Sequence, residues 1–490
     1  MLDVMRATWA LDLAACEHKM PVFPAIAAAR GEDIARCRLK PGESLPGTRT
    51  LAAALGVHRN TVIAAYRELE AQGFTETSPA KDTRVRGELP ARARRQARAR
   101  PDQLGFDLAR LPVDASPSPE PTAGAIALYG GMPDLAAVPN RELARAYRRA
   151  LLGRRAPLGY GDPAGEGPLR EALASLLARS RGFSPRAEDL LITRGSQLAL
   201  YLTARVLLRP GDRVAVEAFG YRPAWSALQA TGAELVPIPV DAEGIDVDAL
   251  ARRADEAPLR AVYVTPHHQY PTTALMSQAR RLRLLELARA HRFATLEDDY
   301  DHEFHYESKP VLPLASRDES GVVVYLGTLS KILAPGLRIG FVSAPAALIS
   351  ELGRYRTIVD RQGSRAEELA VAELIEEGVL ERHARKMRRA YHARRDALVD
   401  ALERRLGDRL AYRVPNGGMA LWARAEGVDV DAWASRAECE GVLVQTARRF
   451  TFDRRPRPFL RLGFAAHPEA RLRAAVERLA RALDASRSPA

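Results

Sequence analysis

The sequence predicts an α/β protein that has a mostly parallel sheet with helices on both faces, preceded by a separate small domain. Three observations lead to this expectation. The chain has 490 residues, and one hydrophobic core rarely extends that far. From about residue 123, short apolar runs alternate with amphipathic stretches, which is typical of strands and covering helices. Residues 88–122 are rich in Arg and Pro, as linkers often are. We therefore expect domains over residues 10–87 and 123–490.

The composition favours a folded chain that is attracted to polyanions. Hydrophobic residues make up 47% of the chain and charged residues 27%, which argues against disorder over most of its length. The net charge of +12 makes nucleic acid or a phosphorylated ligand a reasonable partner. The same charge also fits a sequence in which arginine is simply the preferred basic residue.

Cysteine usage and hydropathy indicate a cytoplasmic protein. The cysteines are Cys16, Cys37 and Cys439, too few and too scattered for a disulfide framework or a cysteine-based metal cluster. The sequence contains no run of about 18 apolar residues that would span a bilayer. We therefore expect neither export nor a membrane segment.

Six Val-rich segments are the predicted strands of the sheet, and their composition suits burial on both faces. In open sheets of this kind, ligands bind outside the carboxyl ends of the strands. Polar residues at those ends are therefore the first candidates for a site. The predicted strands end at Glu217, Val240, Pro266, Tyr300, Gly327 and Ala344.

Residues 47–74 have the spacing of a helix-turn-helix. The second helix places Val62, Tyr66 and Leu69 on one face. Gly73 is suited to end that helix in a left-handed conformation. An ordinary helical hairpin would also fit this pattern.

The other face and the first turn of the second helix contain Arg59, Asn60 and Thr61. A helix that enters the major groove needs hydrogen-bond donors near its N-terminus. The stretch PGESLPGTRTLAAALGVHRNTVIAAYRELEAQGF closely resembles the GntR-type winged helix, and the resemblance covers about residues 10–87. It implies binding to double-stranded operator DNA, with Arg49 among the contact residues.

Two departures from the GntR-type pattern concern the DNA-binding surface. His58 stands where the family commonly has a serine, and an imidazole is a poorer helix cap than a hydroxyl. The wing over residues 78–85 lacks a Gly-rich tip, which leaves Lys81 and Arg84 to meet phosphate. The arginines of residues 88–100 are interpreted as a solvated linker rather than as a phosphate-binding segment.

The segment GTLSKILAPGLRIGF follows a buried strand and contains one lysine, Lys331. A lysine beside another cation can lose its proton near neutral pH, and a neutral amine condenses with an aldehyde. Arg338 supplies that cation and a planar group that grips a phosphate ester. The preceding strand ends in EDDYDHEF, where Asp298 is placed to keep a pyridine nitrogen protonated. Tyr300, on the same face of that strand, is placed to bond a phenolate oxygen.

Two nearby groups of polar residues are suited to an ion or an anion. Asp298, Asp299 and Asp301 have the oxygen ligands that a divalent metal prefers, but no further acidic cluster completes such a site, so we expect no metal. Ser196 and Gln197 lie at a strand-to-helix junction. There, backbone N–H groups at a helix N-terminus form a phosphate cradle.

Together these motifs resemble the fold-type I aminotransferases, over about residues 123–485, and the pairing with a GntR-type head resembles the MocR subfamily of regulators. The resemblance implies a PLP-dependent transferase-like fold with a smaller C-terminal α+β subdomain, and pyridoxal 5'-phosphate as the cofactor. It implies that Lys331 carries the internal aldimine, Asp298 meets the pyridine nitrogen and Tyr300 meets the phenolic oxygen. Around the phosphate it implies Ser196, Gln197, Thr328, Ser330 and Arg338.

Three more residues have roles that the resemblance implies. Tyr221 looks like the aromatic residue that stacks on the cofactor ring. Tyr160 matches the tyrosine that reaches the cofactor of the neighbouring subunit, which implies a homodimer. Arg461 corresponds to the arginine that grips the α-carboxylate of an amino-acid ligand, and an apolar interior strand seldom holds a charge without such a partner.

The segment TPHHQYPTTALMS departs from the aminotransferase pattern. Enzymes of this fold typically have an Asn-Pro-Thr-Gly run where this chain has Tyr270 and Thr273 at the outer positions. The asparagine that helps polarise the phenolic oxygen is therefore absent, and His268 and Gln269 are the candidates to replace it. Phe219 also replaces a proline that is common before the stacking tyrosine.

The leading hypothesis is a DNA-binding transcription regulator whose aminotransferase-like domain senses pyridoxal phosphate, or an amino-acid or amine effector, through Lys331. The alternative is a working aminotransferase with an accessory DNA-binding head, since the residues that transamination needs are all present. A third hypothesis, a DNA-binding scaffold with an inert pocket, predicts no trapped adduct at Lys331. The sequence leaves open whether the domain turns over substrate.

Overall fold

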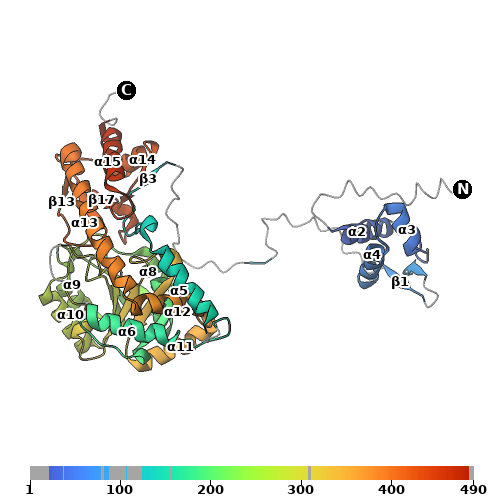
Figure 1. Cartoon of the computed structure of the whole chain (residues 1–490), viewed down its shortest axis with the longest axis horizontal. Coiled ribbons are helices and arrows are strands. Elements are labelled where there is room, and N and C mark those ends of the chain that lie inside the picture. Colours follow the sequence, from blue (N-terminus) through green and yellow to red (C-terminus); the bar gives the residue numbers. More distant parts are fainter. Residues whose placement is uncertain are drawn as a thin grey trace. The chain divides into compact units, whose positions relative to one another are not determined.

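The computed structural model describes residues 21–36, 38–78, 82–87, 106–107, 124–153, 157–306 and 311–484. The chain forms two compact units, Met1–Arg110 and Leu111–Ala490, which are drawn in Figure 1. Each unit is described by itself. The linker predicted over residues 88–122 lies outside the described residues, apart from 106–107.

The described part of the N-terminal unit contains three helices and two paired strands. Helices α2 and α3 both pack against α4, and strands β1 and β2 pair antiparallel. The turn between α3 and α4 has Gly56 with a φ of +64°, a conformation that favours glycine. The unit is therefore a winged helix-turn-helix. Its elements are α2 (Val22–Ala35), α3 (Thr48–Leu55), α4 (Arg59–Ala71), β1 (Thr75–Thr77) and β2 (Thr83–Val85).

The buried face predicted for α4 is confirmed. Val62 and Leu69 are fully buried and Tyr66 is nearly so, all within the core of this unit. Gly73 follows the end of the helix with a φ of +77°, as predicted for a left-handed terminating residue. The opposite side of α4 is thereby left to solvent or to a partner.

The C-terminal unit is built on a seven-stranded sheet with the strand order β4-β12-β11-β10-β9-β5-β6. Only β12 runs antiparallel to its neighbours in this sheet, because residues 329–338 are too few to form a crossover helix between β11 and β12. All six predicted strands are present, each ending within two residues of the prediction. The bounds are β4 (Leu190–Arg194), β5 (Arg213–Glu217), β6 (Glu234–Ile238), β9 (Ala261–Val264), β10 (Ala294–Asp299), β11 (Val323–Thr328) and β12 (Ile339–Ser343).

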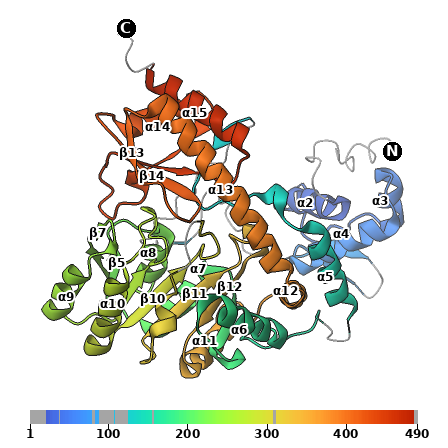
Figure 2. The same cartoon turned by 60° about the vertical axis from the view of Figure 1, so that its left-hand side comes forward.

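Helices cover both faces of this sheet, as Figure 2 shows. On β5, Val214 packs with the helices of one face and its neighbour Ala215 with those of the other, as expected from the alternation of side chains along a strand. The predicted α/β fold class is confirmed. One face is covered by α7 (Ser196–Leu207), α8 (Arg222–Gln229) and α11 (Ala346–Val359), and the other by α9 (Val247–Glu256) and α10 (Gln278–His291).

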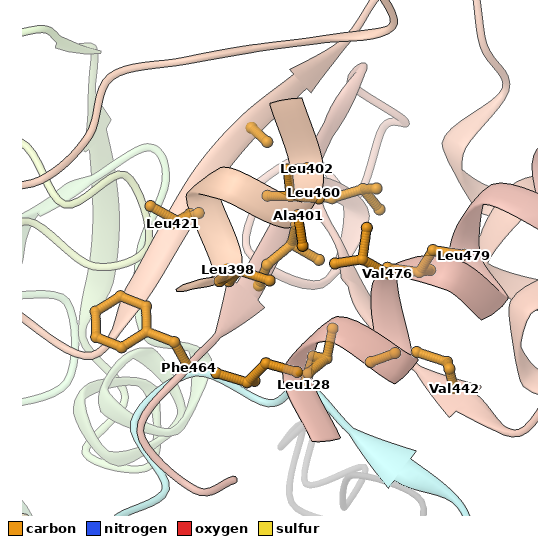
Figure 3. Packing of buried hydrophobic residues seen from close by; sticks show 14 of the residues in the cluster. Leu128, Leu398, Ala401, Leu402, Leu421, Val442, Leu460, Phe464, Val476 and Leu479 are labelled. Atoms are coloured by element: carbon orange, nitrogen blue, oxygen red, sulfur yellow. The ribbon is translucent and has the colours of Figure 1, made fainter. Parts of the chain in front are cut away.

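A smaller sheet of strand order β13-β14-β17-β16 forms the α+β subdomain. Figure 3 shows Leu398 and Leu402 of one helix and Val476 of another packed close to Leu460 of the sheet. Apolar side chains between helices and sheet make this a core of its own. The elements are β13 (Leu410–Tyr412), β14 (Ala420–Ala425), β16 (Gln445–Thr446), β17 (Phe459–Gly463), α13 (Val379–Leu406), α14 (Val430–Cys439) and α15 (Glu469–Asp484).

Helix α13 belongs to both cores of the C-terminal unit. Near its start, Leu380 and Ala384 pack in a cluster with the larger sheet and its flanking helices, whereas Leu398 and Leu402 pack in the smaller subdomain. Figure 2 shows α13 running from the smaller sheet toward α12. The flanking helices are α5 (Asn140–Leu152), α6 (Gly167–Arg181) and α12 (Arg365–Glu376).

Candidate functional site

Lys331 lies just beyond the end of β11, where sequence analysis expected a site. Its Nζ donates a hydrogen bond to the Gly131 carbonyl oxygen at 2.7 Å. Burial, together with the positive charge of Arg461, lowers the pKa of Lys331 to about 8. A lysine with this pKa is partly neutral at physiological pH, and the neutral amine is the form that attacks an aldehyde carbon.

Arg461 lies on β17, between two other strands of the smaller sheet. The side chain is 1% exposed, and its Cζ is 4.2 Å from the centre of the Tyr270 ring. Within the described residues, its Nε and Nη1 have no hydrogen-bond partner. A Cβ at Gly130 would lie 2.2 Å from Arg461 Nη1, so glycine is needed there. A buried guanidinium with free donors is suited to a carboxylate ligand.

Asp298 lies next to the carboxyl end of β10 and has one free oxygen. Its Oδ2 accepts a hydrogen bond from the Tyr263 hydroxyl at 2.6 Å, while its buried Oδ1 has no partner among the described residues. Burial raises the pKa of Asp298 to about 6, and the Tyr263 hydrogen bond opposes that rise. A carboxylate held by one oxygen and free at the other is suited to a protonated ring nitrogen.

Three tyrosines lie close together near these groups. The ring centre of Tyr270 is 5.4 Å from that of Tyr221 and 6.0 Å from that of Tyr300. The Tyr300 hydroxyl donates to the His268 carbonyl oxygen at 2.9 Å. Burial raises the pKa of Tyr221 to about 12, so that phenol stays neutral. The contacts of Tyr221 and Tyr300 with a cofactor ring stay predictions.

The start of α7 and Arg338 form a place for an anion. Ser196 and Gln197 are the first residues of α7, after Gly195 with a φ of +77°. Arg338 donates through Nη2 to the Arg194 carbonyl oxygen at 3.1 Å, and a Cβ at Gly195 would lie 2.8 Å from that nitrogen. The Gln197 side chain donates to the first turn of α8. Helix-start N–H groups beside a guanidinium favour a phosphate.

Thr328 and Ser330 reach the same place through β12. Thr328 lies opposite Gly340 in the sheet, and a Cβ at Gly340 would lie 2.6 Å from the Ser196 nitrogen. The Thr328 hydroxyl donates to Ser330 Oγ at 3.0 Å. The structure thus brings the residues predicted to surround a phosphate to one end of β11, although their contacts with phosphate stay predictions.

Tyr160 lies at the surface. Its side chain is 78% exposed, and the Arg361 guanidinium covers its ring at 4.1 Å. Arg365 donates to the Tyr160 carbonyl oxygen at 3.3 Å. Its role toward the cofactor of a second subunit stays a prediction.

Polar side chains of the loop after β9 form hydrogen bonds within the loop and to neighbouring segments. Gln269 donates through Nε2 to the carbonyl oxygens of Phe219 and Tyr270, both at 2.7 Å. His268 Nδ1 lies 2.7 Å from Asp301 Oδ1. Both candidates to replace the missing asparagine are thus bonded to protein groups, and their role toward the phenolic oxygen stays a prediction.

In the N-terminal unit, local hydrogen bonds fix the start of α4. Arg59 donates through Nε to Thr48 Oγ1 at 3.2 Å, and His58 Nδ1 accepts from the Asn60 backbone nitrogen at 3.3 Å. The imidazole therefore does cap the helix. In the predicted wing, Lys81 lies outside the described residues. The residues predicted to contact DNA lie in the first turns of α3 and α4: Arg49, Arg59 and Asn60, which are exposed, and Thr61, which is half-buried.

Comparison with known proteins supports both units. Residues 25–85 match the family of bacterial regulatory proteins called gntR, and residues 133–479 match aminotransferase class I and II. The probable rhizopine catabolism regulatory protein MocR of Rhizobium meliloti is 34% identical over 431 residues, which cover 87% of this chain and 86% of that protein. The chain belongs to the MocR-type regulators of the GntR family.

Two further matches agree with this MocR-type assignment. The HTH-type transcriptional regulator TauR of Rhodobacter capsulatus is 35% identical over 92% of this chain and 94% of that protein. The structure of the kynurenine aminotransferase of Pyrococcus horikoshii has a TM-score of 0.70 at 32% identity, over 75% of this chain and 93% of that chain. This MocR-type chain is therefore a DNA-binding transcription regulator with an aminotransferase-like domain.

The cofactor of this MocR-type chain is pyridoxal 5'-phosphate, as the aminotransferase family match implies, and the residues present fit it. The free Oδ1 of Asp298 and the partly neutral Lys331 suit the ring nitrogen and the aldehyde. Arg338 and the start of α7 suit the phosphate. When bound, the cofactor supplies an aldehyde carbon that condenses with amines and a ring that accepts electrons.

The MocR-type chain has two further properties within the part that the structure describes. No helix there is long and apolar enough to cross a membrane. No group of three or more His, Cys, Asp or Glu residues there has the arrangement of a metal site.

Several residues of this MocR-type site were not assigned a role from the sequence. Tyr263 holds Asp298, and Gly130 and Gly131 contact Arg461 and Lys331. Glu217 ends β5, is 1% exposed, and accepts a hydrogen bond from Thr265 Oγ1 at 2.8 Å. Two features of the sequence could have indicated these residues. One is the polar Tyr263 within an apolar strand, and the other is the acidic Glu217 at the end of a predicted strand.

We expect Glu217→Gln to remove a pH-dependent destabilisation. Burial raises the pKa of Glu217 from 4.5 to about 7, so the folded chain holds this proton more tightly than the unfolded chain. The proton on Glu217 stabilises the folded chain relative to the unfolded chain. This stabilisation is fully present below pH 4.5 and is lost as the pH rises through 7. The wild type should therefore lose about 3 kcal/mol relative to the variant between pH 4.5 and 8. Urea unfolding at both pH values measures this, and exposed Glu171→Gln is the control; a pH-independent difference would contradict it.

Proposed function

We propose that this regulator binds operator DNA as a homodimer, and that pyridoxal phosphate or an amino ligand reacting at Lys331 changes how the dimer binds. The supporting observation is Arg461, a buried guanidinium with free donors whose charge acts on Lys331. Such a group accommodates the carboxylate of an amino acid. A ligand that reacts at Lys331 and pairs with Arg461 distinguishes two states of the site, and only differential binding shifts a conformational equilibrium.

The surface proposed for DNA is the start of α4 together with the start of α3. Arg59 and Asn60 are exposed, and the bond from Arg59 to Thr48 ties the two helices together. Arginine makes paired hydrogen bonds to guanine in the major groove, and asparagine does so to adenine. We therefore propose that α4 is the recognition helix and that Arg49 contacts phosphate.

The homodimer is supported by apolar surface near Tyr160. Leu158 is 88% exposed, Tyr160 78% and Ile358 81%. Exposed apolar patches on a folded chain commonly mark protein interfaces. A second copy that covers this surface would bring its Tyr160 to the partner's cofactor site, as the resemblance implies.

The function is tested with DNA from upstream of the protein's own gene. Electrophoretic shift and footprinting are compared for the protein without cofactor, with pyridoxal phosphate, and with pyridoxal phosphate plus each member of an amine and amino-acid panel. We expect a change in affinity or footprint length with at least one ligand. Identical binding under every condition would discard the sensor.

We expect Arg59→Ala to weaken binding to this DNA about 10- to 100-fold, because a base-contacting arginine contributes about 1–3 kcal/mol. Fluorescence anisotropy of labelled DNA measures the change. Arg36→Ala is the matched control, since this exposed arginine at the end of α2 pairs with Glu32 on its own helix. Equal loss in both variants would show a general charge effect instead of recognition by α4.

A working aminotransferase is the second candidate function. It is favoured by the presence of Lys331, Asp298 and Arg461 in one site and by the structural similarity to the kynurenine aminotransferase of Pyrococcus horikoshii. Sustained turnover of an amino acid with a keto-acid acceptor would support it. A single half-reaction that stops would support the sensor.

A further inference from the structure

A second cavity opens between the larger sheet and the smaller subdomain of the C-terminal unit. Its volume is about 740 Å³, which is in the range of small-molecule sites. One side is formed by the loops after β9 and β6, and the other by β14, β17 and the segment before β14. A ligand there would touch both subdomains at once.

This cavity is distinct from the candidate cofactor site. Lys331, Asp298 and Arg461 are not among its lining residues. Thr272 of the loop after β9 lines the cavity, whereas Tyr270 of the same loop lies under Arg461. The loop therefore has one side toward each site.

Aromatic rings form one wall of the cavity. Trp422 and Phe459 are stacked with ring centres 5.2 Å apart and an interplanar angle of 8°. Phe219 meets Trp422 edge to face at 6.0 Å. All three rings line the cavity. Flat rings on a cavity wall favour a planar aromatic ligand.

Histidine side chains form the opposite wall. His267, His268 and His305 line the cavity, and His302 stacks on His267 at 4.3 Å. Burial lowers the pKa of His305 to about 3 and that of His267 well below its usual range, so these rings are neutral. The Nδ1 atoms of His267 and His305 have no hydrogen-bond partner within the described residues. Both nitrogens are enclosed by protein, so these histidines give the cavity an uncharged wall.

The charge at the cavity favours an anion. Arg413 lines the cavity, is exposed, and has no acidic partner in the described part of the chain. Arg424 lines it as well, and its ion pair with Glu426 is exposed to solvent at both ends. Among the described lining residues the acid is Asp241, and Arg280 donates to both of its carboxylate oxygens, at 2.7 and 2.6 Å. The rim is therefore complementary to a carboxylate.

We propose that this cavity is a second small-molecule site, which binds a planar aromatic carboxylate between Trp422 and the histidines, with the carboxylate toward Arg413. No covalent step is involved. Binding in this cavity does not depend on chemistry at Lys331. A result that contradicts the proposed sensor therefore does not contradict this second site.

The two sites are connected by aromatic contacts. Phe450 lies between Trp422 of the cavity and Tyr270 of the cofactor site, with ring centres 5.9 and 5.5 Å away respectively, and Tyr270 supports Arg461. A ligand that presses on Trp422 therefore shifts packing under the guanidinium. By thermodynamic linkage, each ligand must change the affinity of the other by the same factor.

The test is isothermal titration calorimetry of the full-length, pyridoxal-phosphate-loaded protein with 1-naphthoate, and with 1-naphthamide as the uncharged probe of the same shape. We expect 1-naphthoate to bind at least 10-fold more tightly than the amide. Trp422→Leu and Arg413→Glu should each weaken 1-naphthoate at least 10-fold. Since Arg413 is exposed, its variant separates lost binding from lost folding.

Arg461→Leu distinguishes this cavity from the cofactor site, where a carboxylate would pair with Arg461. The variant should bind 1-naphthoate as the wild type does, even though its affinity for α-amino acids is lost. Absence of 1-naphthoate binding, equal binding of the amide, or loss of binding in Arg461→Leu would each overturn the proposal. Arg317→Glu, at an exposed arginine that does not line the cavity, serves as the charge-matched control and should leave binding unchanged.

Discussion

Replacing Lys331 by alanine is expected to abolish covalent attachment of pyridoxal phosphate and every response of DNA binding to amines. The reason is that Lys331 has an amine made partly neutral by burial and by the charge of Arg461. Alanine removes that nucleophile without adding bulk. Borohydride reduction followed by peptide mass mapping measures attachment, and anisotropy with operator DNA measures the response.

Lys386→Ala is the control for Lys331→Ala, since Lys386 is an exposed lysine on α13. It should retain both the adduct and the amine response. Binding of unliganded Lys331→Ala to DNA should stay within about 2-fold of the unliganded wild type, because the N-terminal unit has a core of its own. An adduct of undiminished yield on another lysine, together with an intact amine response, would refute the assignment of Lys331.

The second large effect is expected from Arg461→Leu. Loss of a paired hydrogen bond between a buried guanidinium and a carboxylate costs about 2–4 kcal/mol, so affinity for α-amino acids should fall on the order of 10²-fold. An amine of the same side chain but without the carboxylate should be unaffected. Spectral titration of the cofactor with both ligand types measures the two affinities.

The stability of Arg461→Leu separates a ligand-binding role from a structural one. The guanidinium is buried with two unpaired nitrogens, so leucine removes an uncompensated charge, and the Tm without amino ligand should rise. If Arg461 instead stabilised the folded chain, the Tm of Arg461→Leu would fall below that of the wild type. Tyr270→Phe is the matched variant, since it keeps the ring that supports Arg461; a fall in amino-acid affinity as large as that of Arg461→Leu would place the effect in the Tyr270 hydroxyl instead.

The site residues that lie close together in the sequence could be predicted from the sequence alone. Lys331 and Arg338 belong to one short run that begins at Thr328, the last residue of β11, and Asp298 lies one residue before the end of β10. Because adjacent parallel strands end at the same edge of a sheet, local sequence was enough to bring these residues together. The sequence predicted only a weaker cap at His58, and the imidazole does accept the Asn60 N–H, at 3.3 Å.

Contacts between distant segments were not predictable. The bond from Tyr263 to Asp298 joins two strands whose register only the folded sheet defines. Gly130 and Arg461 are far apart in the chain, yet the Arg461 side chain lies so close to Gly130 that a Cβ there would not fit. The cavity near Trp422 requires two subdomains to face each other, and no local pattern encodes that distance. The antiparallel direction of β12 follows from the short connection between β11 and β12. That short connection is visible in the sequence, but the prediction of a mostly parallel sheet did not take it into account.

Helix α13 limits how the two subdomains can move. It contains 28 residues and so extends about 42 Å, with its two ends anchored in different cores. A helix without an internal proline or glycine resists sharp bending. If the smaller sheet tilts when a ligand enters, the far end of α13 must swing with it and push on α12. A small adjustment around Arg461 would thereby become a larger displacement at the opposite edge of the unit.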